Sequence, residues 1–324
     1  MPIYQPTSEN IERAAQLLRD GELVALPTET VYGLGANALD IEAVQKIFSL
    51  KGRPSYNPLI VHVLDIKSAK KLAAVWPQRA QVLAEAFWPG ALTLVLPKRD
   101  TVPDIVTAGL QNVALRAPSH PVARQLLKIA QLPLAAPSAN KFTQTSPTRA
   151  QHVQQSLGDE LFVLDGGACE VGIESTVLDL TGDVPVILRP GTISHADIET
   201  VLREKIDIEY SIQEDEAPKR APGQVRIHYA PRAKLLVFTS PTQRDELLKT
   251  ASNPNRIGAI IWSDENVKLQ HLVKVSNNAL QYAAQFYNAL HELDAQDCDV
   301  ILVEDVPRTS KWDGVRDRLY RAAS

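Results

Sequence analysis

The chain has 324 residues, 44% of them hydrophobic and 22% charged, which is typical of an ordinary globular protein and argues against disorder. A formal net charge of −4 argues against a surface that binds nucleic acid over its whole extent, but is compatible with a local basic cleft. Since no apolar stretch approaches the roughly 20 residues of a membrane span and the first residues do not resemble a signal peptide, we expect a cytoplasmic protein that does not enter a membrane.

The first two thirds of the chain alternates helical and extended segments. Apolar residues at helical spacing predict a helix over 10–21, and the apolar run after it predicts a strand over 22–27. A second such pair follows, a helix over 40–52 with Asp40 as its N-cap and Gly52 as its end, and a strand over 58–65. Further strands are expected at 91–97, 113–117, 133–136, 161–165, 175–180 and 185–189, with helices near 78–87, 121–130 and 148–156.

The regular pattern breaks after about residue 205. From 206 to 232 an acidic run, three prolines and a glycine predict a linker. Beyond it, apolar strands at 234–239, 256–262 and 299–306 alternate with helical stretches at 241–252, 279–296 and 310–323. We therefore predict one α/β domain over 1–205, a linker over 206–232, and a small α/β domain with a mostly parallel sheet over 233–324.

A polar loop follows the first strand, and a basic turn ends the second helix. In this turn, Lys51 and Arg53 stand two residues apart, so in extended backbone their side chains face the same way. Arginine binds phosphate through two parallel hydrogen bonds and lysine adds a mobile charge, but the same pattern is also typical of a solvated helix end. His62, in the next strand, is equally open between a ligand-binding residue and an ordinary core residue.

Three later segments place small polar side chains where an apolar strand ends. Loops at strand ends bind ligands in α/β sheets, yet the same residue types also favour simple turns. No Cys/His/Asp cluster for a tight metal site, no G-x-x-x-x-G-K-[ST] loop and no G-x-S-x-G elbow is present. The residues alone therefore predict binding of a small phosphorylated or anionic ligand. The polar side chains concerned are Ser138, Asn140, Ser146, Glu174, Ser175, Thr176 and Arg189.

A series of motifs resembles the YrdC-type threonylcarbamoyl-AMP synthases. In order they are PTETVYGLG, KGRPSYNPLIVHV, FWPGALTLVL, ALRAPSHP, APSAN, SPT, GIESTV and LRPG. The resemblance covers about residues 9–200, and APG (221–223) with HYAP (228–231) resembles the longer two-domain form. It implies a twisted mixed sheet with a concave cleft, followed by a linker and a small Rossmann-like three-layer α/β domain.

The resemblance also implies a reaction. L-Threonine, bicarbonate or CO2, and ATP would give threonylcarbamoyl-adenylate and pyrophosphate, and partner proteins would use the product to modify the adenosine beside the tRNA anticodon. Mg²⁺ would arrive on the triphosphate, held by phosphate oxygens and water with few protein ligands.

By position, the family pattern also implies roles for single residues. Arg116 would be the partner of the threonine carboxylate, while Lys51 and Arg53 would stabilise the transferring phosphate. From the length and composition of the linker, we also expect residues 221–231 to fold back over the cleft with Tyr229 contacting ATP, the alternative being that Tyr229 docks the second domain. The threonine set is Thr30, Tyr32, His62, Arg116 and Ser175, and the ATP set is Lys51, Arg53, Asn57, Ser138, Asn140, Ser146, Arg189 and Tyr229.

Two departures and two alternatives remain. Phe142-Thr143 stands where the family often has Ser-Gly, and QVRI (224–227) differs from commoner versions, which leaves contacts from 141–145 and the role of Arg226 open. One alternative is a carbamoyl-adenylate-forming domain like those of hydrogenase-maturation proteins, whose acylphosphatase-like and zinc-finger modules are not visible here. The other is a non-catalytic RNA-binding module, which the net charge disfavours, although a weak RNA contact is compatible with it.

Overall fold

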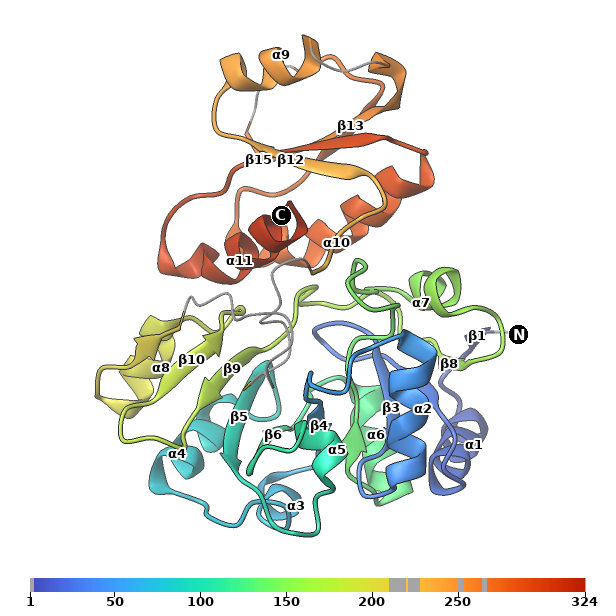
Figure 1. Cartoon of the computed structure of the whole chain (residues 1–324), viewed down its shortest axis with the longest axis vertical. Coiled ribbons are helices and arrows are strands. Elements are labelled where there is room, and N and C mark those ends of the chain that lie inside the picture. Colours follow the sequence, from blue (N-terminus) through green and yellow to red (C-terminus); the bar gives the residue numbers. More distant parts are fainter. Residues whose placement is uncertain (1–2, 210–219, 221–227, 250–252, 264–266, 324) are drawn as a thin grey trace.

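The computed structural model describes residues 3–209, 220, 228–249, 253–263 and 267–323, which form two α/β units (Figure 1). The motifs APG and QVRI, with Arg226, lie outside the described residues, and so does most of the predicted linker. The first unit contains β1 (Ile3–Tyr4), α1 (Ser8–Arg19), β2 (Val24–Leu26), β3 (Gly33–Asn37), α2 (Ile41–Lys51), β4 (Ile60–His62), α3 (Ile66–Ala69), α4 (Gln78–Phe87), β5 (Leu92–Pro97), α5 (Asp104–Thr107), β6 (Asn112–Arg116), α6 (Pro121–Ala130), β7 (Leu134–Ala135), α7 (Ala150–Leu157), β8 (Phe162–Leu164), β9 (Thr176–Asp179), β10 (Val186–Arg189), α8 (His195–Leu202) and β11 (Asp207–Ile208). The second contains β12 (Lys234–Phe238), α9 (Pro241–Lys249), β13 (Ile257–Ile261), β14 (His271–Lys274), α10 (Ala279–Ala295), β15 (Val300–Glu304) and α11 (Asp313–Ala322), with short 3₁₀ turns at Pro254–Arg256 and Ser310–Trp312.

The large sheet has the strand order β1-β8-β2-β3-β7-β4-β6-β5-β9-β10-β11. Its strands pair in both senses, for example β4 with β6 in parallel and β5 with β6 antiparallel, so the sheet is mixed. The parallel pairing of β4 and β6 sets His62 directly beside Arg116. Two residues singled out in separate sequence motifs are therefore neighbours across the sheet.

Helix α1 illustrates how the sequence forms the covering layer. The Thr7 side chain accepts a hydrogen bond from the Asn10 amide and begins the helix. The buried residues recur at the spacing of one helix face, which packs on α6 and on strands β2 and β8. These buried positions are Ile11, Ala14, Ala15 and Leu18.

The small sheet, in the order β12-β15-β13-β14, is entirely parallel. Helix α9 lies on its outer face, and α10 and α11 lie between this sheet and the large-sheet unit (Figure 1). The expected fold class, a large mixed sheet followed by a small three-layer α/β unit, is confirmed. No helix among the residues that the structure describes is long and apolar enough to cross a membrane.

Six helices and strands of the described residues were not expected from the sequence: β1, β3, α3, α5, α8 and β14. Strand β3 was missed because its glycines resemble a turn. Glycine is needed there because the neighbouring strand β2 comes close. A Cβ at Gly35 would lie 2.8 Å from Leu26 Cδ2. In addition, β11 lies inside the stretch predicted as linker and pairs with β10, so the large sheet extends beyond residue 205.

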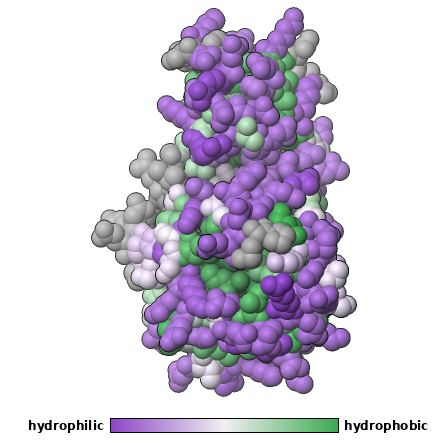
Figure 2. Space-filling view, turned by 90° about the vertical axis from the view of Figure 1, so that its right-hand side faces the viewer, coloured by the Kyte–Doolittle hydropathy of each residue, from purple (hydrophilic) through white to green (hydrophobic). Residues whose placement is uncertain are grey.

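The two units meet through glycines as well as side chains. A Cβ at Gly172 would lie 2.4 Å from the Ala283 carbonyl oxygen of α10, and a Cβ at Gly314 of α11 would lie 2.5 Å from the Gly191 carbonyl oxygen. Backbone therefore touches backbone on both helices. On the face in Figure 2, hydrophilic residues cover most of the surface, and hydrophobic residues gather in a hollow of the large-sheet unit.

Candidate active site

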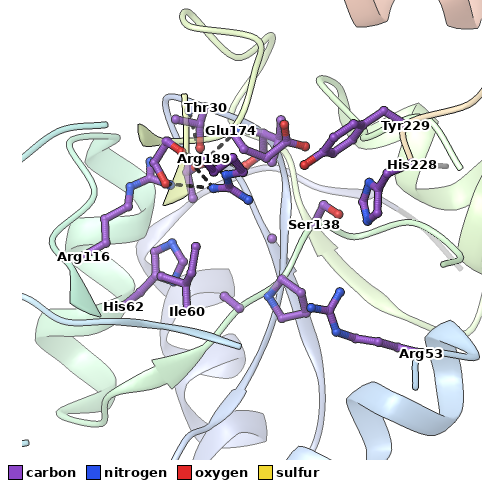
Figure 3. A pocket seen from close by; sticks show the side chains of 16 residues that line it. Thr30, Arg53, Ile60, His62, Arg116, Ser138, Glu174, Arg189, His228 and Tyr229 are labelled. Atoms are coloured by element: carbon purple, nitrogen blue, oxygen red, sulfur yellow. Dashed lines mark hydrogen bonds between the residues drawn. The ribbon is translucent and has the colours of Figure 1, made fainter. Parts of the chain in front are cut away.

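Most of the predicted site residues line one cavity, which lies beside the ends of several strands of the large sheet (Figure 3). Arg116 and His62 lie on one side, Arg53, Ser138, His228 and Tyr229 lie on the other, and Thr30, Glu174 and Arg189 lie between them. The space that the centres of water molecules can occupy in this cavity is about 50 Å³, which is room for only a few waters. The predicted residues in its lining are Thr30, Arg53, His62, Arg116, Ser138, Ser175, Arg189 and Tyr229.

At one end, Arg116 forms a buried ion pair. Its Nη2 lies 2.7 Å from Glu29 Oε1, and its Nε donates to the Gly90 carbonyl oxygen at 3.2 Å. Burial alone would raise the pKa of Glu29, but the charge and hydrogen bonding of Arg116 outweigh it, so that pKa lies below its ordinary value. An anionic ligand that reached Arg116 would therefore share it with Glu29.

His62 contributes a neutral imidazole at the same end. Burial, and then the nearby Arg116 charge, lower its pKa to about 3. Its Nδ1 is buried and has no hydrogen-bond partner among the described residues. The ring can therefore exchange a hydrogen bond with a ligand at neutral pH without adding a charge.

Hydroxyl groups and an arginine connect the two ends. Thr30 Oγ1 lies 2.9 Å from Thr28 Oγ1, and Ser175 Oγ lies 2.8 Å from Thr93 Oγ1. Arg189 donates through Nη2 to the Ser175 carbonyl oxygen at 2.9 Å. The strand end that carries Ser175 is thus held by Arg189, whose own strand β10 is the neighbour of β9.

At the other end, Arg53 and Lys51 have different positions. Arg53 lines the cavity and donates to the carbonyl oxygens of Asn57 and Pro58, at 3.2 and 2.8 Å. Lys51 does not line it, because its Nζ donates to the carbonyl oxygens of Ser138 (2.6 Å) and Asn140 and so braces that loop. Burial, and then the Arg53 charge, hold the pKa of Lys51 well below its ordinary value.

Four further predicted residues stand behind the cavity lining. Tyr32 is not a pocket wall, because its hydroxyl donates to the Gly167 carbonyl oxygen at 2.8 Å, away from the cavity. Asn140 donates within its own loop, and Ser146 donates to Glu174 at 2.5 Å. Asn57 is fully buried, and its amide group has no partner in the described parts of the chain.

The residues that depart from the family pattern hold the HYAP segment. Thr143, at a φ of 69°, accepts a hydrogen bond from the Ala230 amide at 2.9 Å. The Phe142 ring lies edge-on to His228, 5.8 Å between centroids, and Arg53 lies 6.0 Å from the same ring. The loop over 141–145 therefore pairs with residues 228–230.

Tyr229 contacts both units. It lines the cavity, is 1% exposed and has a φ of 64°. Its ring stacks on Tyr287 of α10 at 5.8 Å, and the Arg318 guanidinium of α11 lies 5.0 Å from its centroid. One side chain therefore both lines the cavity of the first unit and packs against the second unit.

Glu174 is the site residue that sequence reasoning noted but did not assign. It lines the cavity, and its carboxylate accepts from Ser146, from the Tyr287 hydroxyl at 3.0 Å and from Arg318 Nε at 2.7 Å. Its place in GIESTV, just before Ser175, was the available signal. Because its partners come from far along the chain, only the structure could identify them.

Comparison with known proteins finds likeness over the whole chain. Residues 16–191 match the Sua5/YciO/YrdC family model, described as telomere recombination, and residues 193–324 match the threonylcarbamoyl-AMP synthase C-terminal domain. The chain is 42% identical to the threonylcarbamoyl-AMP synthase of Bacillus subtilis (strain 168), over 97% of this chain and 92% of that one. The corresponding Schizosaccharomyces pombe protein is 36% identical, over 98% and 89%.

A solved structure shows the same arrangement. The crystal structure of Pyrococcus abyssi Sua5 complexed with L-threonine superposes with a TM-score of 0.94 at 38% sequence identity. The match covers 100% of this chain and 98% of that one. The likeness thus includes the second unit and its placement against the first.

Proposed function

Since the chain belongs to the Sua5/YciO/YrdC family and carries the threonylcarbamoyl-AMP synthase C-terminal domain, we propose that it makes threonylcarbamoyl-adenylate and pyrophosphate from L-threonine, bicarbonate or CO2, and ATP. The product would serve the threonylcarbamoyl modification of tRNA beside the anticodon, completed by partner proteins. The observation that carries the proposal is a cavity with arginines at both ends and a neutral imidazole beside one of them.

The threonine end of the cavity is the one with Arg116. Its guanidinium suits a carboxylate, and His62, which is neutral, adds a hydrogen-bonding group without repelling the amine. Thr30 and Ser175 supply hydroxyls within the same lining. The likeness to a protein solved with L-threonine supports this assignment.

The chemistry has two steps. The threonine amine, after losing a proton, attacks CO2 and forms a carbamate. A carbamate oxygen then attacks the α-phosphorus of ATP, the bond to the β-phosphate oxygen breaks, and pyrophosphate leaves. Both reacting groups are anionic, so positioning and cationic side chains supply most of the acceleration.

Arg53 is the side chain best placed to stabilise that transfer, with Arg189 between the two ends. Lys51 would act by holding the Ser138–Asn140 loop that frames the nucleotide end. Asn57, whose amide lacks a protein partner, is available to a ligand or to water once the loop adjusts. The centres of water molecules reach only about 50 Å³ of the cavity, so Tyr229 and His228, which line it, would move aside to admit ATP.

Magnesium would enter as part of the nucleotide. Across the described residues, no group of three or more His, Cys, Asp or Glu side chains is arranged to hold a metal ion. An ion that arrives on the nucleotide would be held by phosphate oxygens and water. The protein residues then bind and orient the nucleotide rather than the ion.

Pyrophosphate release from ATP, followed with each reactant omitted in turn, tests the proposal. We expect release only when ATP, threonine and bicarbonate are all present, because the carbamate must form before the α-phosphate is attacked. Serine should be a poorer substrate by about 1 to 3 kcal/mol in transition-state binding, the usual worth of one methyl group in a pocket. Pyrophosphate release that continues undiminished without threonine would refute the assignment.

A further inference from the structure

Glu174 places a carboxylate in the wall of a cavity proposed to receive a triphosphate. It is 7% exposed, and Arg189 and Tyr229 line the same space. An uncompensated negative charge there would repel the phosphates of ATP at short range, where burial reduces screening by solvent. Something must therefore neutralise Glu174 before nucleotide can bind well.

The neutralising charge comes from the second unit. Arg318, on α11, is fully buried, and its Nε donates to Glu174 Oε2 at 2.7 Å. The Tyr287 hydroxyl of α10 donates to the same oxygen at 3.0 Å. Burial by itself would raise the pKa of Glu174, but the Arg318 charge, then Arg189 and the hydrogen bonds, hold it below its ordinary value.

The other contacts of Arg318 do not replace this one. Its Nη1 donates to Asp317, but Asp317 also accepts from Arg321 Nε at 2.9 Å. If Arg318 were removed, Asp317 would keep a cation, whereas Glu174 would lose its closest one. Arg318 also lies 5.0 Å from the centroid of Tyr229, a second group in the cavity lining.

We propose that Arg318 is a positioning residue of the nucleotide site, contributed by the second unit, which acts by neutralising Glu174 and holding it in place. The inference rests on the proposed function and deepens it. The catalytic cleft of the first unit becomes fit for a triphosphate only when α11 is docked on it. Arg318 does not line the cavity, so its effect on the substrate passes through Glu174.

A double-mutant cycle in the full chain tests this role. The variants are Arg318→Met, Glu174→Gln and the pair together, with Arg316→Met as control, because Arg316 lies on the same helix but pairs with Asp313. ATP affinity is measured by calorimetry, and KM for ATP, KM for threonine and kcat are measured from pyrophosphate release.

We expect Arg318→Met to raise the KM and Kd for ATP at least tenfold, while KM for threonine changes less than threefold. In the Glu174→Gln background the same change should cost less than threefold, because no carboxylate is left to neutralise. Arg316→Met should stay within twofold of the unsubstituted chain. Equal losses from Arg318→Met in both backgrounds, or a threonine KM that rises as much as that of ATP, would overturn the inference.

The proposal can still be tested if the Arg318→Met variant does not fold. If Arg318→Met alone does not fold, the double variant is compared with Glu174→Gln, since both lack the buried carboxylate. ATP binding within threefold between these two supports the inference, and a tenfold difference overturns it. An unsubstituted chain that neither binds ATP nor releases pyrophosphate refutes the proposed function as well, whereas an active one whose variants break this pattern refutes the inference alone.

Discussion

At the scale of single residues, the two arginines at opposite ends of the cavity make different contacts. Arg116 faces a carboxylate of its own chain, Glu29, whereas Arg53 donates to backbone carbonyls and meets the cavity beside Ser138 and Tyr229. The loss of Arg116 and the loss of Arg53 should therefore change the free energy of unfolding by different amounts. Arg116 is the one whose loss leaves a buried charge unpaired.

The two arginines should divide the work between substrate binding and catalysis. Arg53→Ala is expected to lower kcat by roughly 100-fold or more, the scale of losing one preorganised electrostatic group. Arg116→Ala should mainly raise KM for threonine, and should also lower the free energy of unfolding by about 3 to 5 kcal/mol because Glu29 loses its partner. Steady-state kinetics and urea unfolding measure both effects.

The control for Arg116 is the double variant Arg116→Ala/Glu29→Gln. It should regain most of the lost stability while KM for threonine stays high, because the carboxylate partner for the substrate is still missing. Similar kinetic losses in the Arg53 and Arg116 variants would contradict this division of labour.

Most of the residues that line the cavity were assigned to a site through the resemblance of their motifs to the family, because the residue types alone are equally typical of turns and helix caps. Lys51 and Tyr32 were misplaced relative to the cavity for a physical reason. Residue spacing indicates which way a side chain points from an extended backbone. It does not indicate whether that side chain will donate to a carbonyl that lies nearby only in the folded chain, as Lys51 does to Ser138 and Tyr32 does to Gly167. Arg318, the ion-pair partner of Glu174, lies 144 residues further along the chain, so no local sequence pattern could indicate the pair.

At the scale of elements, the segment at 228–230 connects the two units. It pairs with the loop over 141–145 through Thr143 and Thr145, and Tyr229 reaches the cavity between Tyr287 and Arg318. The sequence predicts that residues 221–231 fold over the cleft, and of these His228 and Tyr229 line the cavity. Residues 221–227 of that prediction lie outside the described residues.

Changes at Tyr229 should separate its ring from its hydroxyl. Tyr229→Ala is expected to weaken ATP binding by at least tenfold and to abolish most adenylate formation, because the cleft loses its cover and its link to the second unit. Tyr229→Phe keeps the stack on Tyr287 and should keep ATP affinity within about threefold, because it removes only a hydroxyl that has no partner in the described residues. Calorimetry with ATP and pyrophosphate release measure both.

A chain ended after residue 205 is the companion test, because it lacks the segment and the second unit together. Loss of adenylate formation in both Tyr229→Ala and this shortened chain is the expected result. Full synthesis with unchanged ATP affinity in both would show that the segment plays no part in the reaction.

Element positions also show the limits of sequence patterns. Helices α2 and α6 begin and end within a residue or so of the predicted limits, because caps and apolar faces are encoded locally. Strand β3 was missed because Gly33 and Gly35 resemble a turn, and the close neighbours that require glycine there belong to other segments. Strand β14, with half-buried side chains at the edge of the small sheet, gave only a weak pattern.

At the scale of the whole molecule, the units are fitted by close backbone contact at Gly172 and at Gly314 against Gly191. Gly314 lies in the first turn of α11, the helix that delivers Arg318 to Glu174. Any side chain at this position must displace the helix, since the atoms opposite belong to backbone. Docking and nucleotide binding are thus linked through one helix.

Gly314→Ala should therefore weaken ATP binding, by about tenfold or more, although every residue of the cavity is unchanged. The added methyl would lie 2.5 Å from the Gly191 carbonyl oxygen, so α11 must shift and the Arg318–Glu174 contact must loosen. Gly182→Ala, where the nearest atom is 3.8 Å away, serves as the control and should leave ATP affinity unchanged. Unaltered ATP affinity in Gly314→Ala would show that docking and binding are independent.

The small volume of the cavity should affect the rate at which ATP binds. The centres of water molecules reach only about 50 Å³ of this space, and His228 and Tyr229 stand in its lining, so we expect these two side chains to move before ATP can occupy the cavity. Association must then wait for an opening event, and the observed rate should stop rising at high ATP concentration and level off at the opening rate. The same closure would delay escape of the newly made mixed anhydride, so the step that limits turnover would be release rather than bond formation.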